Sequence, residues 1–119
     1  MLHVLYIDDE PDLLDIGKSF LEANGEFAID TATSPGRGLE MLEMTRYDAV
    51  ICDYQMPDMD GISVLKTLRS SGNGIPFILF IYKDIEITQR FRIPESGFID
   101  HTLPVINQFT GIGYIFCII

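Results

Sequence analysis

Apolar residues along the chain follow two patterns, short unbroken runs and longer segments with helical spacing. Four short runs, rich in β-branched and aromatic residues, are predicted to be strands at 3–8, 27–33, 48–53 and 75–81. Three intervening segments repeat their apolar residues at helical spacing, and they lie at 10–25, 34–46 and 61–74. The pattern therefore predicts strands that alternate with helices through the first two-thirds of the chain.

Residues that start or stop helices lie at the ends of these segments. Pro11 suits the first turn of a helix, and Asp12 beside it favours the positive end of the helix dipole. Ser34 is a favourable N-cap with Pro35 at the first helical position, and Gly25 marks the end of the first helix. These signals support the helix boundaries that the spacing indicates.

The order of the elements predicts the fold. Strands that alternate with helices of this length form right-handed βαβ units, which indicates an α/β fold with a doubly wound parallel sheet. In such sheets ligands bind outside the carboxyl ends of the strands. Asp8 and Asp9 follow the first strand, and Asp53 ends the third. With the first strand central, these ends are neighbours, so the three carboxylates are expected to lie together.

Three carboxylates at one edge of a sheet repel one another, so at least one pKa is raised unless a counter-charge is present. Mg²⁺ prefers oxygen ligands and often pairs one or two carboxylates with a phosphate group. Asp53 is also a candidate nucleophile, since aspartate forms acyl phosphates. The alternative for each acid taken singly is a turn former or a helix cap. Their grouping at neighbouring strand ends favours a functional site.

The composition fits one globular domain and narrows the choice of partner. The chain has 119 residues, of which 47% are apolar and 22% charged, and a net charge of −10 argues against nucleic-acid binding. Of its 18 acids, 4 lie after residue 80, so 14 lie in the first two-thirds. The acidity is therefore concentrated in the same part of the chain as the candidate site.

Cysteine usage and the first residues indicate the cellular compartment. Cys52 and Cys117 suggest neither a disulfide framework nor a thiolate metal site. The opening residues, MLHVLYIDDEPD, turn acidic at once and are unlike a signal peptide. No window offers the roughly 18 apolar residues of a membrane span. We therefore expect a cytoplasmic protein that binds neither membrane nor nucleic acid.

The pattern weakens beyond residue 81. Residues 84–97 alternate like a strand, and Pro94 blocks a long helix. No charged residue follows Asp100, and the segment TGIGYIFCII is β-branched, aromatic and broken by glycine. Such a segment, unless it is buried in the sheet, forms an aggregation or oligomerisation surface. The alternative is that it replaces a fifth strand or helix.

Two stretches match a known family. VLYIDDEPDLLDIGKSFLE resembles the first strand, acidic pair and first helix of the receiver domain of two-component response regulators, and YDAVICDYQMPDMDGISVLKTLR resembles its phosphoacceptor strand and the following loop. The resemblance implies a flavodoxin-like fold with strand order 2-1-3-4-5, whose last βα unit is atypical or degraded. It also implies a single domain over 1–119, receiver-like at 1–80 and divergent at 81–119.

The resemblance assigns a role to each matching residue. Asp53 would receive a phosphoryl group from a histidine kinase, and Asp9 and Asp53 would ligate Mg²⁺ directly. Asp8 would act directly or through water, the backbone carbonyl of Gln55 would be a further ligand, and Met56 would occupy the loop beside the phosphoryl group. Two further residues would shape the turn that follows, Pro57 and Gly61.

The chain departs from the family at the positions that couple phosphorylation to output. Receivers carry Thr or Ser at the end of strand four, where this chain has Ile81, which has no hydroxyl to donate. They also carry a lysine before a proline after strand five, where this chain has Leu103 before Pro104. Lys83 is a substitute that reaches the site or, alternatively, an exposed loop residue. His101 falls nearest the aromatic switch position.

The resemblance implies a stand-alone response regulator receiver of two-component (phosphorelay) signalling, with no enzymatic activity beyond self-catalysed phosphotransfer and dephosphorylation. Its partners would be a sensor histidine kinase and a downstream protein that the sequence does not identify, and the chain would be a monomer or weak homodimer. Ile81 and the missing lysine predict impaired switching. The alternatives are a pseudo-receiver that binds proteins without accepting phosphate, and a Mg²⁺-dependent phosphohydrolase. The latter is disfavoured because Gln55 stands where an acid/base aspartate is usual.

Two explanations account for the abrupt loss of receiver character after Phe80. Residues 81–119 come either from a shifted reading frame or truncated gene, or from ordinary divergence, which the fragment ESGFID supports. Translating the coding DNA in its other two frames distinguishes them. A frame that restores a threonine after strand four and a Lys-Pro pair would support the shift.

Overall fold

The computed structural model describes residues 1–82 and 114–118 of the chain. Strands and helices alternate through the first of these segments, as predicted, with ends that differ by a few residues from the expected ones. The elements in chain order are β1 (Leu2–Ile7), α1 (Pro11–Glu22), β2 (Phe27–Ala32), α2 (Pro35–Met44), β3 (Ala49–Asp53), α3 (Gly61–Ser70), β4 (Phe77–Tyr82) and β5 (Tyr114–Ile118).

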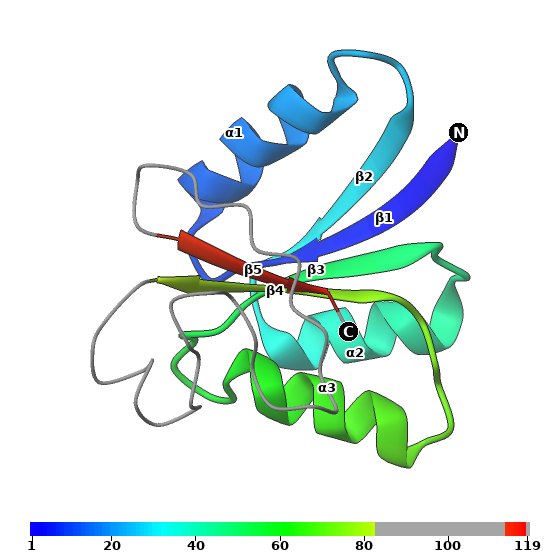
Figure 1. Ribbon diagram of the computed structural model, residues 1–119, viewed down its shortest axis with the longest axis vertical. Coiled ribbons are helices and arrows are strands. Elements are labelled where there is room, and N and C mark those ends of the chain that lie inside the picture. Colours follow the sequence, from blue (N-terminus) through cyan, green and yellow to red (C-terminus); the bar gives the residue numbers. More distant parts are fainter. Residues whose placement is uncertain (83–113, 119) are drawn as a thin grey trace.

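The strands form one sheet in the order β2-β1-β3-β4-β5. The first four are parallel, which confirms the predicted doubly wound sheet with β1 between β2 and β3. One face of the sheet is covered by α1 and the other by α2 and α3 (Figure 1). Covering both faces explains why the central strands β1 and β3 are nearly continuous apolar runs, since most of their residues are buried.

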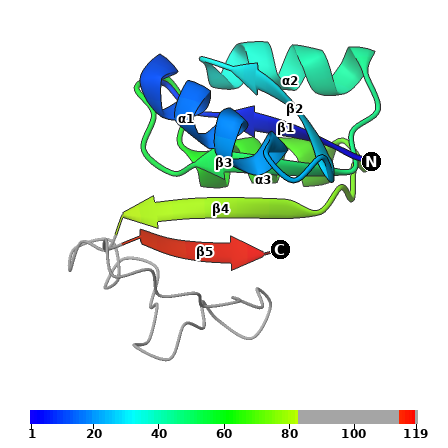
Figure 2. The same ribbon diagram turned by 90° about the horizontal axis from the view of Figure 1, so that it is seen from above.

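The fifth strand differs in direction from the family fold that the resemblance implies. β5 occupies the expected fifth place but pairs antiparallel with β4, from Tyr82 opposite Tyr114 to Ile78 opposite Ile118 (Figure 2). A parallel fifth strand requires a crossover connection over the sheet, whereas an antiparallel one does not. The last unit was expected to be atypical, and its described part is an edge strand that runs antiparallel to β4.

Alternate residues of each central strand enter two hydrophobic clusters. Leu5 and Ile7 of β1 face the cluster on the side of α2 and α3, while Val4 and Tyr6 face the cluster that contains Leu14 of α1. Full burial of one such aliphatic side chain stabilises the fold by about 1.5–3 kcal/mol. The two clusters hold the strands in fixed register, and this register positions the residues at the strand ends.

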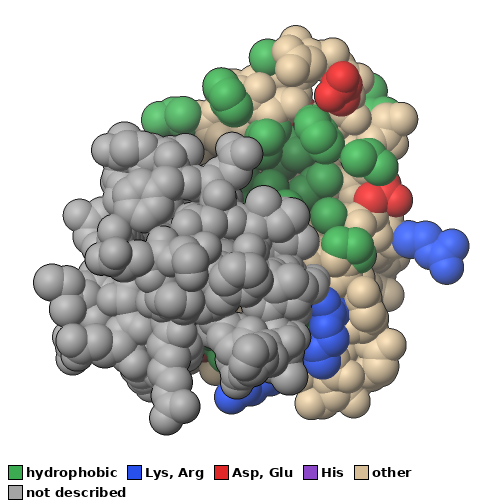
Figure 3. All heavy atoms as spheres, viewed as in Figure 1, with side chains coloured by type: hydrophobic (Ala, Val, Ile, Leu, Met, Phe, Trp, Pro, Cys, Tyr) green, Lys and Arg blue, Asp and Glu red, His purple; other side chains and the backbone are tan. Residues whose placement is uncertain are grey.

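Helix α1 exposes several large apolar side chains to solvent. Leu13, Ile16 and Phe20 are spaced three and four residues apart on one face of the helix, and they are 40%, 67% and 79% exposed. Hydrophobic side chains gather on this part of the molecule (Figure 3). In the part of the chain that the structure describes, no helix has the length and apolar character needed to span a membrane.

The residues predicted to start and stop helices occupy those positions in the structure. The Oγ atom of Ser34 accepts a hydrogen bond from the Arg37 backbone N–H at 3.2 Å, and Pro35 occupies the first turn of α2. Pro11 and Asp12 lie in the first turn of α1, as predicted. Gly25 has a φ of 72°, a left-handed conformation that glycine adopts without steric cost, which explains why the chain turns there.

Candidate functional site

Three carboxylates meet at the carboxyl ends of the central strands. Ile7 of β1 pairs with Cys52 of β3, so the next residues along the two strands, Asp8 and Asp53, lie side by side. Asp9 joins them, and one carboxylate oxygen of each residue lies within 4.8 Å of the others. The structure thus brings together the three acids that the sequence predicted to meet, although Asp8 and Asp53 are 45 positions apart in the chain.

The turn from β1 into α1 fixes the position of Asp8. Its backbone N–H donates to the carbonyl of Ala32 at 3.1 Å, and its Oδ1 accepts from the backbone N–H of Glu10 at 3.0 Å. The side chain is 4% exposed, the one buried charged side chain in the described part of the chain. A carboxylate held in this way has little freedom to turn away from its neighbours.

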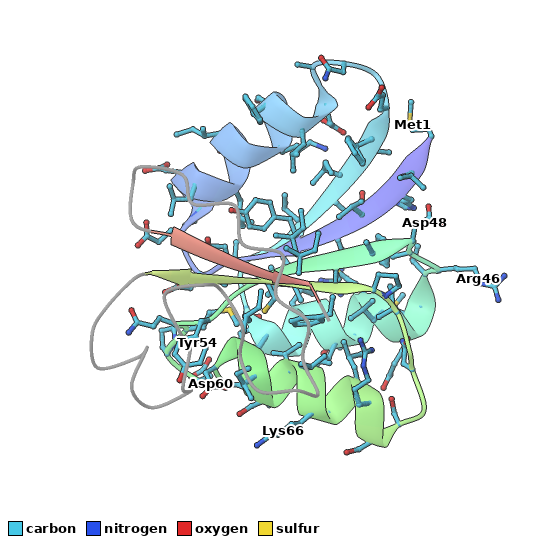
Figure 4. All side chains as sticks on the ribbon, in the orientation of Figure 1. Met1, Arg46, Asp48, Tyr54, Asp60 and Lys66 are labelled. Atoms are coloured by element: carbon cyan, nitrogen blue, oxygen red, sulfur yellow. The ribbon has the colours of Figure 1, made fainter. Side chains whose placement is uncertain are left out.

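Hydrogen bonds fix the start and the end of the loop between β3 and α3. Asp60 caps α3, since its Oδ1 accepts from the Ser63 backbone N–H at 2.7 Å, and the Gly61 N–H donates to the Tyr54 carbonyl at 2.9 Å. Tyr54 and Asp60 lie at the same end of the molecule in Figure 4, opposite Asp48. The cap by Asp60 was not predicted, although an aspartate immediately before an amphipathic helix is its usual signal.

Gly61 is required by close packing. A Cβ atom at this position would lie 2.5 Å from the Asp53 carbonyl oxygen and 2.5 Å from Cδ1 of Leu79. Real side chains do not approach backbone so closely, so only glycine allows α3 to start directly against the end of β3. The role implied for Gly61, a close approach of backbone, agrees with this geometry.

Burial and mutual repulsion raise the pKa values of two of the three acids. Burial raises the pKa of Asp8 to about 6. The hydrogen bond from the Glu10 backbone N–H opposes this rise, and repulsion from Asp9 and Glu10 adds to it. Burial also raises the pKa of Asp53 to about 7, with Asp8 and Asp9 adding repulsion that outweighs the hydrogen bonds from the backbone at Tyr54 and Gln55. The site therefore concentrates negative charge that a bound cation would stabilise.

The donor set fits a hard divalent cation. It consists of three carboxylates, and such oxygen ligands suit Mg²⁺, which accepts one or two carboxylates and fills its other positions with water or phosphate oxygens. The raised pKa values of Asp8 and Asp53 come first from burial and then from repulsion among the acids, so ionising them costs free energy that a bound cation would offset. These residues would hold the cation, while the backbone carbonyl predicted as a further ligand, that of the exposed Gln55, stays a prediction.

The structure describes some of the other predicted site residues and not others. Met56 lies in the loop after β3, where its side chain is 9% exposed and belongs to the cluster on the side of α2 and α3. Phe80 of β4 pairs with Asp53, so the backbone of Ile81 lies one residue further toward the carboxyl end of the sheet. The predicted positions Lys83, His101, Leu103 and Pro104 lie outside the described residues.

The raised pKa values predict how stability depends on pH. Since folding raises the pKa of Asp8 and of Asp53 above 3.8, both favour the folded state below that value, and their contribution is lost as the pH rises through about 6 and about 7. The melting temperature of the metal-free protein is thus expected to fall over this window, and Mg²⁺ is expected to reduce the fall. Thermal unfolding with a chelator and with Mg²⁺ measures both effects.

A second pair of acids provides the internal control for this measurement. A hydrogen bond from the Tyr47 hydroxyl lowers the pKa of Asp30, and a hydrogen bond from the Ile29 backbone lowers that of Glu22. These groups contribute stability above their ordinary pKa values and lose it as the pH falls, so they act in a more acidic window. A melting temperature that rises between about pH 5 and about 7 without Mg²⁺ would contradict the assignment, because Glu22 and Asp30 are fully ionised over that range.

Comparison with known proteins identifies relatives of the chain. It matches the family Response regulator receiver domain over residues 4–102. It is 28% identical over 100 residues to the response regulator MprA of Mycobacterium leprae, an alignment that covers 84% of this chain and 43% of that protein. The chain thus spans less than half the length of the curated relatives it matches.

Solved structures show the same relationship. The receiver domain of the Francisella response regulator 1452 is 32% identical, with a TM-score of 0.64, over 66% of this chain and 64% of that one. The response regulator TrrA of Thermotoga maritima, solved in complex with Mg²⁺ and BeF, is 30% identical, with a TM-score of 0.60, over 65% and 66%. A complex of the histidine kinase ThkA with TrrA matches at 32% identity and a TM-score of 0.61, over 66% and 67%.

Proposed function

The chain belongs to the response regulator receiver domain family of two-component systems, and from this we propose that Asp53 accepts a phosphoryl group from a sensor histidine kinase. The observation that carries the proposal is the convergence of Asp8, Asp9 and Asp53 at the ends of the central strands. A half-buried carboxylate beside a cation site has the nucleophile and the charge stabilisation that transfer of a phosphoryl group requires.

The proposed reaction is a transfer between two side chains. A carboxylate oxygen of Asp53 attacks the phosphorus of a phosphohistidine, the new P–O bond forms as the P–N bond breaks, and the electron pair of that bond returns to the imidazole, which takes up a proton. Bound Mg²⁺ would supply positive charge to the phosphoryl oxygens. Asp8 and Asp9 would hold the cation beside Asp53, and its charge would lower the pKa of Asp53 so that the carboxylate is ionised.

The proposed partner follows from a related protein. TrrA, 30% identical to this chain, is described in complex with a histidine kinase. At the carboxyl edge of the sheet, the half-exposed Asp9 and Asp53 would meet a phosphohistidine carried by another protein. The downstream partner stays undefined, because the relatives that match extend well beyond the length of this chain.

Intact mass measurement tests the proposal. After incubation with acetyl phosphate and Mg²⁺, the protein is expected to gain the mass of one phosphoryl group, and EDTA is expected to prevent the gain. Circular dichroism of the EDTA-treated sample verifies that it is folded. A folded protein that binds Mg²⁺ but gains no mass would contradict the proposal and favour the alternative, a pseudo-receiver that binds partners without phosphorylation. That alternative is supported by Ile81, which lies at the end of β4 where the family has a hydroxyl.

We also propose that phosphorylation switches the output surface poorly. Ile81 cannot donate a hydrogen bond to a phosphoryl oxygen, and a ligand shifts a conformational equilibrium only through contacts that differ between the two states. With Mg²⁺ and BeF as a phosphoryl mimic, amide chemical shifts are expected to change around the acidic site and little beyond Tyr82. In the variant Ile81→Thr the changes are expected to extend further. Large changes beyond Tyr82 in the unmodified protein would contradict the hypothesis.

A further inference from the structure

A connection of three residues joins β1 to helix α1. The strand ends at Ile7, the helix begins at Pro11, and between them lie Asp8, Asp9 and Glu10. The two aspartates belong to the candidate Mg²⁺ site, and Glu10 donates its backbone N–H to Oδ1 of Asp8 at 3.0 Å. Because so short a connection has little slack, a shift of α1 relative to the sheet moves these carboxylates.

A glycine lies on the face of α1 that packs against the sheet. Gly17 is three residues after the buried Leu14 and four before Leu21, which packs against the same hydrophobic cluster. An amphipathic helix usually carries a large apolar side chain at such a position. Alanine is also more favourable than glycine in the middle of a helix, so the reason for glycine here lies in its contacts.

The ring of Tyr6 occupies the space that a side chain at position 17 would need. A Cβ atom on Gly17 would lie 2.6 Å from Cε2 of Tyr6, with Cδ2 and Cζ at 3.4 and 3.5 Å. Tyr6 is buried, and its backbone pairs with Thr31 of β2 on one side and with Ile51 of β3 on the other. Since the ring and its strand are enclosed, a larger residue at position 17 would push α1 away from the sheet.

We propose that Gly17 is a positioning residue for the Mg²⁺ ligands. By letting α1 lie directly against Tyr6, it sets how closely Asp8 and Asp9 approach Asp53, and thereby the affinity of the site for Mg²⁺. The inference rests on the proposed function, in which these three acids bind the cation. Mg²⁺ demands near-ideal octahedral geometry with ligands at about 2.0–2.1 Å, so a small displacement of two carboxylates weakens its binding.

Calorimetric titration of Mg²⁺ into the metal-free protein tests the inference without a phosphodonor. Gly17→Ala is expected to weaken Mg²⁺ binding by about tenfold, the lower end of what a change behind the metal ligands causes. Gly36→Ala is the matched control, because it also introduces alanine into a helix but meets no atom within 4 Å, and its affinity is expected to equal that of the parent. A folded Gly17→Ala protein that binds Mg²⁺ as tightly as the parent would overturn the inference, as would equal losses in the two variants.

A substitution of Tyr6 separates positioning from a general loss of stability. Tyr6→Leu removes the ring atom nearest to the added Cβ, so Gly17→Ala no longer pushes α1 outward in that background. The double variant is therefore expected to bind Mg²⁺ at least as tightly as Tyr6→Leu alone. This comparison decides even if Gly17→Ala by itself does not fold. A double variant that binds Mg²⁺ more weakly than Tyr6→Leu would exclude action through Tyr6 and overturn the inference.

The titration also distinguishes this role of Gly17 from phosphoryl acceptance by Asp53. An unmodified chain that binds Mg²⁺ but gains no phosphoryl group would contradict the proposed acceptance and leave the role of Gly17 intact. An unmodified chain that gains a phosphoryl group, together with a Gly17→Ala variant of unchanged Mg²⁺ affinity, would do the reverse.

Discussion

Replacing Asp53 with asparagine is expected to reduce phosphoryl uptake from acetyl phosphate to the background level. The amide oxygen is a poor nucleophile and cannot form the acyl phosphate. The variant is also expected to melt at a higher temperature than the metal-free parent at neutral pH. The carboxyl of Asp53 has a pKa of about 7 because of burial and repulsion, and a neutral amide removes that unfavourable charge.

Asp58→Asn provides the matched control. It makes the same change of charge in the loop that follows β3, but on an exposed side chain that takes no part in the proposed reaction. Its phosphoryl uptake is expected to equal that of the parent. Uptake that persists in Asp53→Asn would show that another residue accepts the phosphoryl group. Equal loss in both variants would indicate that uptake depends on the overall charge of the loop.

Replacing Gly61 with alanine is expected to destabilise the fold by about 1–3 kcal/mol, the cost of inserting a methyl group into a closely packed site. The new Cβ atom would meet the Asp53 carbonyl oxygen and Leu79 Cδ1, each at 2.5 Å. Because one of these atoms is the backbone of Asp53, α3 must move away from the end of β3. Phosphoryl uptake is therefore expected to slow as well. Urea unfolding and the rate of mass gain measure the two effects.

Gly36→Ala is the control for this substitution. Gly36 also lies in the first turn of a helix, but nothing lies within 4 Å of an added Cβ atom. Alanine there is expected to stabilise the protein by about 0.5–1 kcal/mol, since it reduces the entropy of the unfolded chain without a clash. A Gly61→Ala variant as stable as Gly36→Ala would show that the loop adjusts freely and does not hold Asp53 in place.

Local patterns were enough to predict the elements and to single out the acids. Alternation of apolar runs with helical segments predicted the first four strands and three helices, and Ser34 and Pro35 predicted the start of α2. These predictions succeed because strand burial and helix capping depend on residues within a few positions of one another. The same patterns predicted that Asp8, Asp9 and Asp53 would meet, because parallel strands end at one edge of the sheet.

The sequence by itself therefore determined the order and type of the elements from β1 to β4, the position of each acid at a strand end, and the family. Only the tertiary structure decided how deeply Asp8 is buried, how far the pKa of Asp53 rises, and that Gly61 packs against its carbonyl. It also decided the reversed direction of β5 and the hydrogen bonds between the Ile29 backbone in β2 and the side chains of Lys18 and Glu22. Each of these depends on contacts between segments distant in the chain, and desolvation and register exist only once those segments have packed together.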